Sequence, residues 1–409
     1  MQWIYLDNNA TTQPAPEVVD AMNEVLREYW ANPSSVHRFG QAVRQRVELA
    51  RSSVARLINC RERDLIFTSG GTESNNLALR GTLLGADVAN NSVPRVLITT
   101  PIEHSAVREP ADDLTRAGVK VVRLGVDRDG WIDPASLAAA LHEHAVPGSL
   151  TLVSIHWANN ETGVIEPIDE MMRVVAAFRM EHADRHVLFH TDATQAVGKL
   201  PVDVAAVPVD LLTMSAHKWH GPKGVGALYV RRGVRLTPQL RGGPQERERR
   251  GGTENTTAII GMGVAAELAR AFLEDEAAIA RLRQLRDRFE EAIVAAIPDA
   301  VVHSASDVNR ARPHGGRLWN TSNIGFPRLE AEAILLGLSE RGVCASAGAA
   351  CSSGSLEPSP VLLAMGIDET IAHGSVRFSL SRYTTEEEIA AAITIVPEVV
   401  NRIARTLPV

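Results

Sequence analysis

The chain has 409 residues, of which 45% are hydrophobic and 22% are charged, and it carries a formal net charge of -7 at pH 7. This length is too great for one small core and predicts two domains, or one large domain with a smaller one. A mildly acidic chain without a basic patch or a block of like charge is not typical of a nucleic-acid-binding protein or of a disordered tail.

The N-terminal residues, MQWIYLDNNATT, lack the positive segment and the long apolar run of a signal peptide. We also expect no apolar stretch that reaches the ~18 residues needed to span a bilayer. Three cysteines form an odd, sparse set without a CxxC pair, namely Cys60, Cys344 and Cys351. Such a set is typical of a reducing compartment and gives no sign of a structural zinc site. The expected location is the cytoplasm, and no metal site is expected.

Apolar runs typical of buried strands alternate with helix-like stretches through the first two thirds of the chain. Strands are expected at 64–70, 95–100, 119–126, 151–157, 186–192, 211–216 and 225–230. Short apolar strands separated by helices predict an α/β fold with a mostly parallel sheet. In such sheets ligands bind beyond the carboxyl ends of the strands.

The pattern changes near residue 265. Apolar residues then recur at steps of three and four up to Ile297, which predicts one or two long helices that Pro298 ends. The later segment 373–383 alternates apolar and polar residues, as expected for a half-buried strand.

These changes predict two domains of different size. A large domain is expected over 15–264, and a smaller α+β domain is expected to combine 1–14 with 265–409. We found no internal repeat and no low-complexity segment.

Lysine is rare in this chain. The 42 basic residues include only four lysines, namely Lys120, Lys199, Lys218 and Lys223. An arginine cannot lose its proton in a protein, whereas a buried lysine can become a neutral nucleophilic amine. Lys218 follows a predicted strand and has three polar neighbours, Ser215, His217 and His220, so it is the main candidate for this chemistry. Lys223 can be either a reactive lysine or an ordinary surface lysine in a turn. Lys199 and Lys120 are expected to be structural.

Other polar residues stand where predicted strands end, and each has an ordinary alternative. Gly71 and Thr72 open a helix after a strand, which suits either a phosphate or a simple helix cap. Asp192 can pair with a protonated ring nitrogen or cap a helix, and Gln195 can face the same cavity or complete a capping box. His104 can stack on a planar ring or be an ordinary hydrogen-bonded histidine.

Three further residues are ambiguous in the same way. Asn160 lies in ANNETG, at another strand end. Arg377 lies on the polar side of a predicted strand, where it suits either a substrate carboxylate or solvent. Cys351 lies among small, flexible residues, which suits a reactive thiol on a loop rather than a core cysteine. Together, a nucleophilic lysine, a strand-end aspartate, a phosphate cradle and a carboxylate-binding arginine predict a pyridoxal phosphate site for an amino acid.

The sequence resembles the cysteine desulfurases of the NifS/IscS group from about residue 5 to residue 390. The motifs that carry the resemblance occur in the family's order; they are YLDNNATT (5–12), NPSSVHRFG (32–40), FTSGGTESNNLA (67–78), ANNETGVIEPI (158–168), HTDATQAVGKLPVD (190–203), SAHKWHGPKGVGALYVRRG (215–233), GGTEN (251–255), ACSSGSLEPS (350–359) and AHGSVRFSLSRYTTEEEI (372–389). Ala216 stands where the family usually has Gly, and Trp157 and Trp219 are bulkier than usual.

The resemblance implies a fold-type I enzyme that depends on pyridoxal 5′-phosphate and acts as a homodimer. Lys218 would bind the cofactor covalently, and His104 would stack on its ring. Asp192 would pair with the ring nitrogen and Gln195 with the phenolic oxygen. Thr253 would reach the phosphate of the partner subunit's cofactor. Within one subunit the phosphate would be held by Gly71, Thr72, Ser215 and His217.

The resemblance also implies the reaction and its substrate. Asn160 would contact the cofactor and, with Arg377, hold the carboxylate of L-cysteine. Lys218 would remove the Cα proton, and Cys351 would accept the sulfur as a persulfide, which leaves L-alanine. An iron–sulfur scaffold or another sulfur-acceptor protein would then take the sulfur.

Two other functions are compatible with the same residues. Selenocysteine lyase, or another pyridoxal phosphate-dependent amino-acid enzyme, would use the same fold without needing Cys351. A non-enzymatic scaffold of this fold would not need Lys218, so the presence of Lys218 argues against it.

Overall fold

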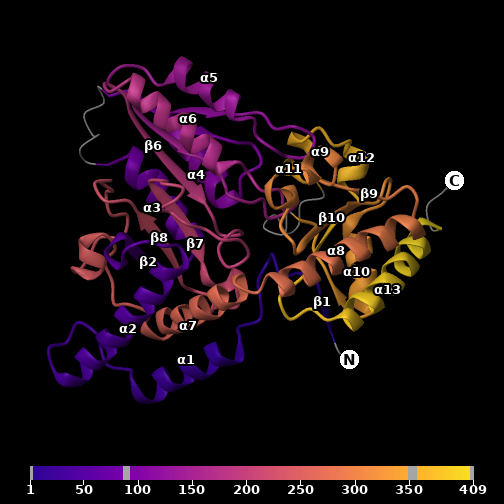
Figure 1. Cartoon of the computed structure of the whole chain (residues 1–409), viewed down its shortest axis with the longest axis horizontal. Coiled ribbons are helices and arrows are strands. Elements are labelled where there is room, and N and C mark those ends of the chain that lie inside the picture. Colours follow the sequence, from indigo (N-terminus) through magenta and orange to yellow (C-terminus); the bar gives the residue numbers. More distant parts are fainter. Residues whose placement is uncertain (1–2, 86–92, 349–356, 406–409) are drawn as a thin grey trace.

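A seven-stranded sheet fills one half of the molecule in the computed structural model, which describes residues 3–85, 93–348 and 357–405 (Figure 1). In spatial order its strands are β2 (Leu65–Thr68), β8 (Gly226–Val230), β7 (Leu211–Ser215), β6 (His186–Asp192), β5 (Leu150–Ser154), β3 (Arg95–Thr99) and β4 (Lys120–Arg123). Within this sheet β8 pairs antiparallel with both neighbours, and the other pairs are parallel. The predicted α/β fold with a mostly parallel sheet is confirmed.

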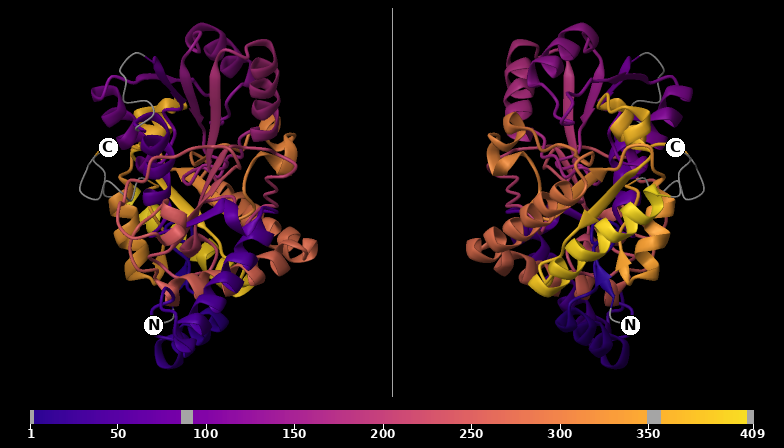
Figure 2. Two further views of the ribbon diagram at one scale, coloured as in Figure 1. Left: turned by 90° about the vertical axis from the view of Figure 1, so that its left-hand side faces the viewer. Right: turned by 90° about the vertical axis from the view of Figure 1, so that its right-hand side faces the viewer.

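Helices cover both faces of this sheet (Figure 2). One face is covered by α3 (Gly71–Leu83) and α4 (Ser105–Arg116). The other is covered by helices that include α2 (Arg38–Leu57), α5 (Pro134–His144), α6 (Ile168–Glu181) and α7 (Thr256–Leu273), and α1 (Pro16–Glu28) packs on α7. Successive strand residues such as Leu97 and Ile98 point to opposite faces and are both fully buried. Burial on both sides explains why these strands are continuously apolar in sequence.

The other half of the molecule has its own core and smaller sheets. An antiparallel sheet joins β9 (Val301–Val302), β10 (Thr321–Gly325) and β12 (Ser375–Ser379), and a parallel pair joins β1 (Ile4–Tyr5) and β11 (Val343–Cys344). The long helices α8 (Glu276–Ala296), α10 (Ala331–Glu340) and α13 (Glu386–Ala404) pack in this core. Shorter helices are α9 (Asp307–Arg310), α11 (Pro360–Ala364) and α12 (Glu369–Ala372).

The two separate cores can be compared with the expected division into a large and a small domain. Leu6 packs with buried residues between 282 and 400, away from the core of the large sheet. The helices expected up to Ile297 are two, since Glu274 and Asp275 separate α7 from α8 and the Asp275 side chain accepts a hydrogen bond from Ala278 N. Because α7 starts before residue 265 and continues past it, the boundary at 264/265 falls inside a helix and stays a prediction.

Helix α7 corrects one expectation from the sequence. It has 18 residues with a mean hydropathy of 1.4, which is long and apolar enough to cross a membrane, although no such segment was expected. Half of it is buried inside the protein. A Cβ on Gly261 would meet Met22 of α1, and one on Gly263 would meet Ala50 of α2, so α7 packs closely on both helices. Its apolar composition therefore serves a buried packing role.

Strand β12 corrects a second expectation. The alternation in 373–383 is present, but every residue of β12 is buried, including Arg377 and Ser379 on the polar side. The N-terminal segment covers that side, because Asp7 bridges to Ser379 and pairs with Arg377. Sequence alternation cannot reveal that a distant segment covers a polar face.

A buried ion pair fixes the contact between the smaller core and the loop after β5. Arg317 makes two hydrogen bonds of 2.9 Å to Glu290 of α8, and both side chains are almost fully buried. The backbone on either side of Arg317 bonds to the loop, with Leu318 N donating to Gly163 O and Ile165 N donating to Gly316 O. The pair therefore holds the segment that supports Asn160.

Replacing Glu290 with alanine should lower the free energy of unfolding by about 3–5 kcal/mol, because it leaves the buried Arg317 guanidinium without its anion. The matched control is Glu398→Ala, which removes the exposed pair with Arg341 and should cost about 0–1 kcal/mol. Chemical denaturation of both variants gives the comparison. Equal losses in the two variants would contradict the assigned role of the buried pair.

Candidate active site

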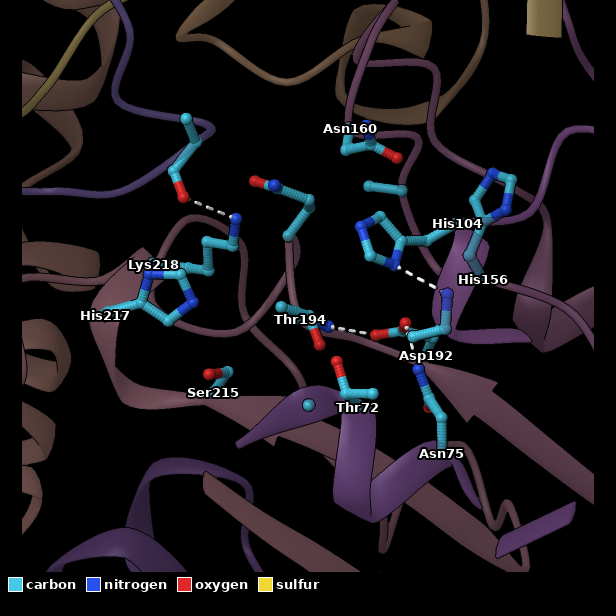
Figure 3. A pocket seen from close by; sticks show the side chains of 15 residues that line it. Thr72, Asn75, His104, His156, Asn160, Asp192, Thr194, Ser215, His217 and Lys218 are labelled. Atoms are coloured by element: carbon cyan, nitrogen blue, oxygen red, sulfur yellow. Dashed lines mark hydrogen bonds between the residues drawn. The ribbon is translucent and has the colours of Figure 1, made fainter. Parts of the chain in front are cut away.

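A cavity of about 260 Å³ lies beyond the carboxyl ends of the parallel strands (Figure 3). This volume is near the lower end of the ~300–1,000 Å³ typical of small-molecule sites. Residues that the sequence analysis singled out line it from five separate segments; they are Gly71, Thr72, His104, Asn160, Asp192, Gln195, Ser215, His217 and Lys218. The fold therefore brings nine of the twelve candidate residues into one cavity.

The N-terminus of α3 forms one end of the cavity. Gly70, just before this helix, has a φ of 154°, in a region that is essentially restricted to glycine. A Cβ on Gly71 would lie 3.2 Å from Thr194 Oγ1, so the backbone approaches that side chain closely. Thr194 Oγ1 itself is buried and has no hydrogen-bond partner in the structure. The helix N–H groups and this hydroxyl can together bind a phosphate.

Ser215 and His217 lie beside the same end of the cavity, at the end of β7 and in the short 3-10 turn that follows (Figure 3). His217 Nδ1 is 3.1 Å from Thr11 Oγ1. Burial and the neighbouring charge of Lys218 lower the pKa of His217 to about 3. His217 is therefore a neutral hydrogen-bonding group at physiological pH rather than a cation.

Asp192 ends β6 and lines the cavity on the side away from Ser215 and His217 (Figure 3). Its Oδ2 accepts a hydrogen bond of 2.8 Å from Asn75 Nδ2, and its Oδ1 accepts one of 2.9 Å from Thr194 N. Each carboxylate oxygen is thus held by one donor. This arrangement orients the carboxylate towards any cation in the cavity.

Lys218 lies beside His217, on the far side of the cavity from Asp192 (Figure 3). It follows β7 in the 3-10 turn Ala216–Lys218, which turns the side chain into the cavity. Its Nζ donates hydrogen bonds of 2.6 Å to Asn9 O and 2.8 Å to Ala10 O. An amine that lines the cavity can reach a carbonyl carbon placed there.

His104 caps α4 and also lines the cavity. Its Nδ1 accepts a hydrogen bond of 3.0 Å from Ala106 N, which fixes the ring at the cavity wall (Figure 3). His104 is therefore a hydrogen-bonded histidine, and its stacking on a planar ring stays a prediction.

Sequence reasoning missed His156, which also lines the cavity. Its Nδ1 lies 3.1 Å from Glu103 Oε1 and its Nε2 lies 3.6 Å from Glu166 Oε1, with all three side chains buried. Burial alone would lower the pKa of His156, but Glu103 and Glu166 raise it to about 9. Burial raises the pKa of Glu166 to about 8, against the opposing effect of His156. The strand expected over 151–157 included His156, whereas β5 ends at Ser154, so an earlier strand end would have placed His156 among the strand-end polar residues.

Arg377 does not line the cavity but lies directly behind Asn160. Its Nη1 donates to Asn160 O at 3.0 Å, and its Nη2 donates to Asp7 Oδ1 at 2.8 Å. The side chain is 2% exposed, so the solvent-facing alternative is wrong. The anionic partner that a buried arginine requires is Asp7 in this structure.

The two remaining candidates lie elsewhere. Thr253 lines a different pocket, together with Arg250 and Asn255, and not the cavity of its own chain. Cys351 lies outside the described residues. The other two cysteines are partly buried, and burial raises the pKa of Cys60 to about 12 and also raises that of Cys344.

The residues present fit pyridoxal 5′-phosphate. A molecule with a phosphate at one end and a ring nitrogen at the other would meet the N-terminus of α3 and the Asp192 carboxylate, and the Lys218 amine lines the same cavity. The partnerless hydroxyl of Thr194 and the close approach at Gly71 are both at the end where the phosphate would bind.

Comparison with known proteins agrees with this geometry. The family model described as aminotransferase class-V matches residues 4–391, so the chain belongs to the class V aminotransferase family. A solved structure described as a NifS-like protein superposes with a TM-score of 0.85 at 34% identity, covering 98% of this chain and 100% of that chain.

Curated relatives specify the group within the family. Cysteine desulfurase 2 of Trichormus variabilis is 48% identical, covering 100% of this chain and 96% of the relative. Cysteine desulfurase NifS of Azotobacter vinelandii is 46% identical, covering 99% and 94% respectively. Within the family the chain is therefore one of the cysteine desulfurases of the NifS/IscS group, and the resemblance noted from its motifs is confirmed.

The raised pKa of His156 predicts a pH-dependent contribution to stability. A histidine whose pKa is raised by folding stabilises fully below its unfolded value of 6.5, and that stabilisation is lost as the pH rises through about 9. His156→Met should therefore be less stable than the unmodified protein by on the order of 3 kcal/mol near pH 6, and the difference should shrink near pH 9.5.

Chemical denaturation at both pH values measures this difference. The control is His186→Met, which changes an exposed histidine at the start of β6. A His156→Met deficit that does not depend on pH would show that the imidazolium does not stabilise the cluster.

Proposed function

We propose that this cysteine desulfurase binds pyridoxal 5′-phosphate in the cavity, attached through Lys218. The observation that carries the proposal is the convergence of the Lys218 amine, the Asp192 carboxylate and the N-terminus of α3 on one cavity. When bound, this cofactor supplies an electron sink for the carbanion that forms at the α carbon of an amino acid.

In this proposal the chain's own residues place and move protons around the cofactor. Asp192, oriented by Asn75 and Thr194, holds a proton at the ring nitrogen. Gln195 would donate a hydrogen bond to the phenolic oxygen, and His104 would stack on the ring. Lys218 accepts the proton that leaves the substrate α carbon, a role that requires an uncharged amine.

The substrate L-cysteine would be oriented through its carboxylate. Asn160 faces the cavity, and Arg377 lies one hydrogen bond behind it. Because Arg377 is paired with Asp7, it reaches a substrate carboxylate only if that ion pair is exchanged or shared. We therefore assign to Asn160 the direct contact with the substrate carboxylate. Arg377 contributes the positive charge that favours an anion beside Asn160.

Cys351 would accept the sulfur. Its thiolate attacks the substrate sulfur, a sulfur–sulfur bond forms, the substrate carbon–sulfur bond breaks, and the products are L-alanine and a persulfide on Cys351. Support comes from the described residues on either side of its segment. Gly348 O accepts from Arg377 Nη1 at 3.5 Å, and Ser359 Oγ donates to Glu161 Oε2 at 2.5 Å, so both ends lie next to Asn160.

The proposal extends to assembly and partners. A cytoplasmic homodimer would let Thr253, which lies outside its own cavity, reach the phosphate bound by the partner subunit. The persulfide would be handed to an iron–sulfur scaffold or another sulfur-acceptor protein, because a sulfur carried on a protein thiol must leave before the next turnover.

The test is sulfide release from L-cysteine in the presence of a thiol reductant, by protein loaded with pyridoxal 5′-phosphate. Cys351→Ala should lower the rate at least about 100-fold, because no thiol remains to attack the substrate sulfur. The matched controls Cys344→Ala and Cys60→Ala remove the other two thiols and should stay within about twofold.

Two outcomes would count against this assignment. Full activity of Cys351→Ala would remove the proposed nucleophile. A large loss in Cys344→Ala, with Cys351→Ala unaffected, would move the role to the thiol of β11.

A further inference from the structure

A second buried lysine lies next to the cavity. Lys199, expected from the sequence to be structural, stands four residues after Gln195 and is 4% exposed. Its Nζ donates hydrogen bonds of 2.8 Å to Asn9 Oδ1 and 2.5 Å to Gln195 Oε1. It does not line the cavity itself, but its partner Gln195 does, and its partner Asn9 accepts a hydrogen bond from Lys218, which also lines the cavity.

The charge of Lys199 is disfavoured where it lies. Burial lowers its pKa well below the usual value, and the charges of Lys218 and Arg377 lower it further. The charged and titratable groups that face it are Lys218, Arg377, His217 and His220. All of them are basic, so these neighbours, taken from the described part of the chain, disfavour an ammonium there. A neutral amine keeps two N–H donors, which matches the two acceptor oxygens around it.

These hydrogen bonds decide which way the Gln195 amide points. In the structure Lys199 Nζ donates to Gln195 Oε1, so the oxygen is the end of the amide that faces the lysine. The Gln195 Nε2 then lies at the other end, where it donates to Asn9 O at 3.0 Å. Its second N–H is left for an oxygen of a ligand in the cavity. With the amide reversed, an oxygen would face the ligand oxygen, and the two would repel.

We propose that Lys199 is a positioning residue that holds Gln195 with its N–H donor, rather than its oxygen, directed at the phenolic oxygen of the cofactor. This inference rests on the proposed function, because it assumes the cofactor in the cavity. Lys199 acts only through Gln195. It contacts neither the cofactor nor the substrate.

The proposal predicts a spectroscopic effect. A hydrogen-bond donor to the phenolic oxygen stabilises the anionic form of that oxygen. The anionic oxygen then holds less tightly the proton that it shares with the nitrogen that links the cofactor to Lys218. Loss of the donor should therefore raise the pH midpoint of the visible absorption of the loaded protein. We expect Lys199→Met to raise this midpoint by about one pH unit, a tenfold change in the proton equilibrium.

A double-mutant cycle separates positioning from a simple charge effect. Removing a cation near Lys218 would raise the midpoint as well, but it would do so whether or not Gln195 is present. The absorption of protein loaded with pyridoxal 5′-phosphate is therefore titrated for Lys199→Met, Gln195→Leu and the double variant. The control is Lys120→Met, an exposed lysine bonded to His144, which should leave the midpoint unchanged.

The proposal requires that Lys199→Met adds little or no shift in the Gln195→Leu background. Equal shifts in both backgrounds would overturn it and assign the effect to charge. If Lys199→Met does not fold, Lys199→Gln, which keeps an N–H donor, should show a smaller shift that also disappears with Gln195→Leu. If the unmodified protein shows no visible absorption band after loading, that result would instead contradict the proposed cofactor. Failure of the Lys199 proposal and failure of the proposed function are therefore distinguishable.

Discussion

Asn9 joins the two halves of the molecule at the active-site cavity, and the arrangement of the site depends on its hydrogen bonds. Its carbonyl oxygen accepts from Lys218 and Gln195, which follow strands of the large sheet. Its side-chain amide donates to Thr321 of β10, and its backbone N–H donates to Ser379 of β12. Because buried polar groups are costly to leave unpaired, this residue constrains both sheets at once. The N-terminal segment is thus part of the site, although it is remote from it in sequence.

The electrostatic environment differs between the two ends of the cavity. At the end formed by Asp192, buried carboxylates predominate, and they raise the pKa of His156 to about 9. At the end formed by Lys218, the basic groups are close together, and burial with mutual repulsion lowers the pKa of His217 to about 3 and that of Lys199 well below its usual value. Such a gradient suits a ligand with a cationic ring nitrogen at one end and a phosphate at the other.

Much of the fold and most of the site could be predicted because the signals were local. The apolar runs of β2 to β8 and the polar residues that follow them are short-range patterns, and parallel strands bring their carboxyl ends together without further information. What could not be predicted depends on contacts between distant segments. The polar side of β12 is covered by Asp7, and Lys199 meets Gln195 and Asn9 only in the folded chain. The sequence alone led us to expect a structural Lys199, and its proposed positioning role rests on these contacts of the folded chain.

The central claim is that the amine of Lys218, and not another lysine, binds the cofactor. The most direct measurement is to load the protein with pyridoxal 5′-phosphate, reduce the linkage with borohydride, and localise the adduct by peptide fragmentation in a mass spectrometer. The account predicts a single pyridoxyl adduct on Lys218, with Lys120, Lys199 and Lys223 unmodified. An adduct on one of those three lysines, or no adduct at all, would contradict it.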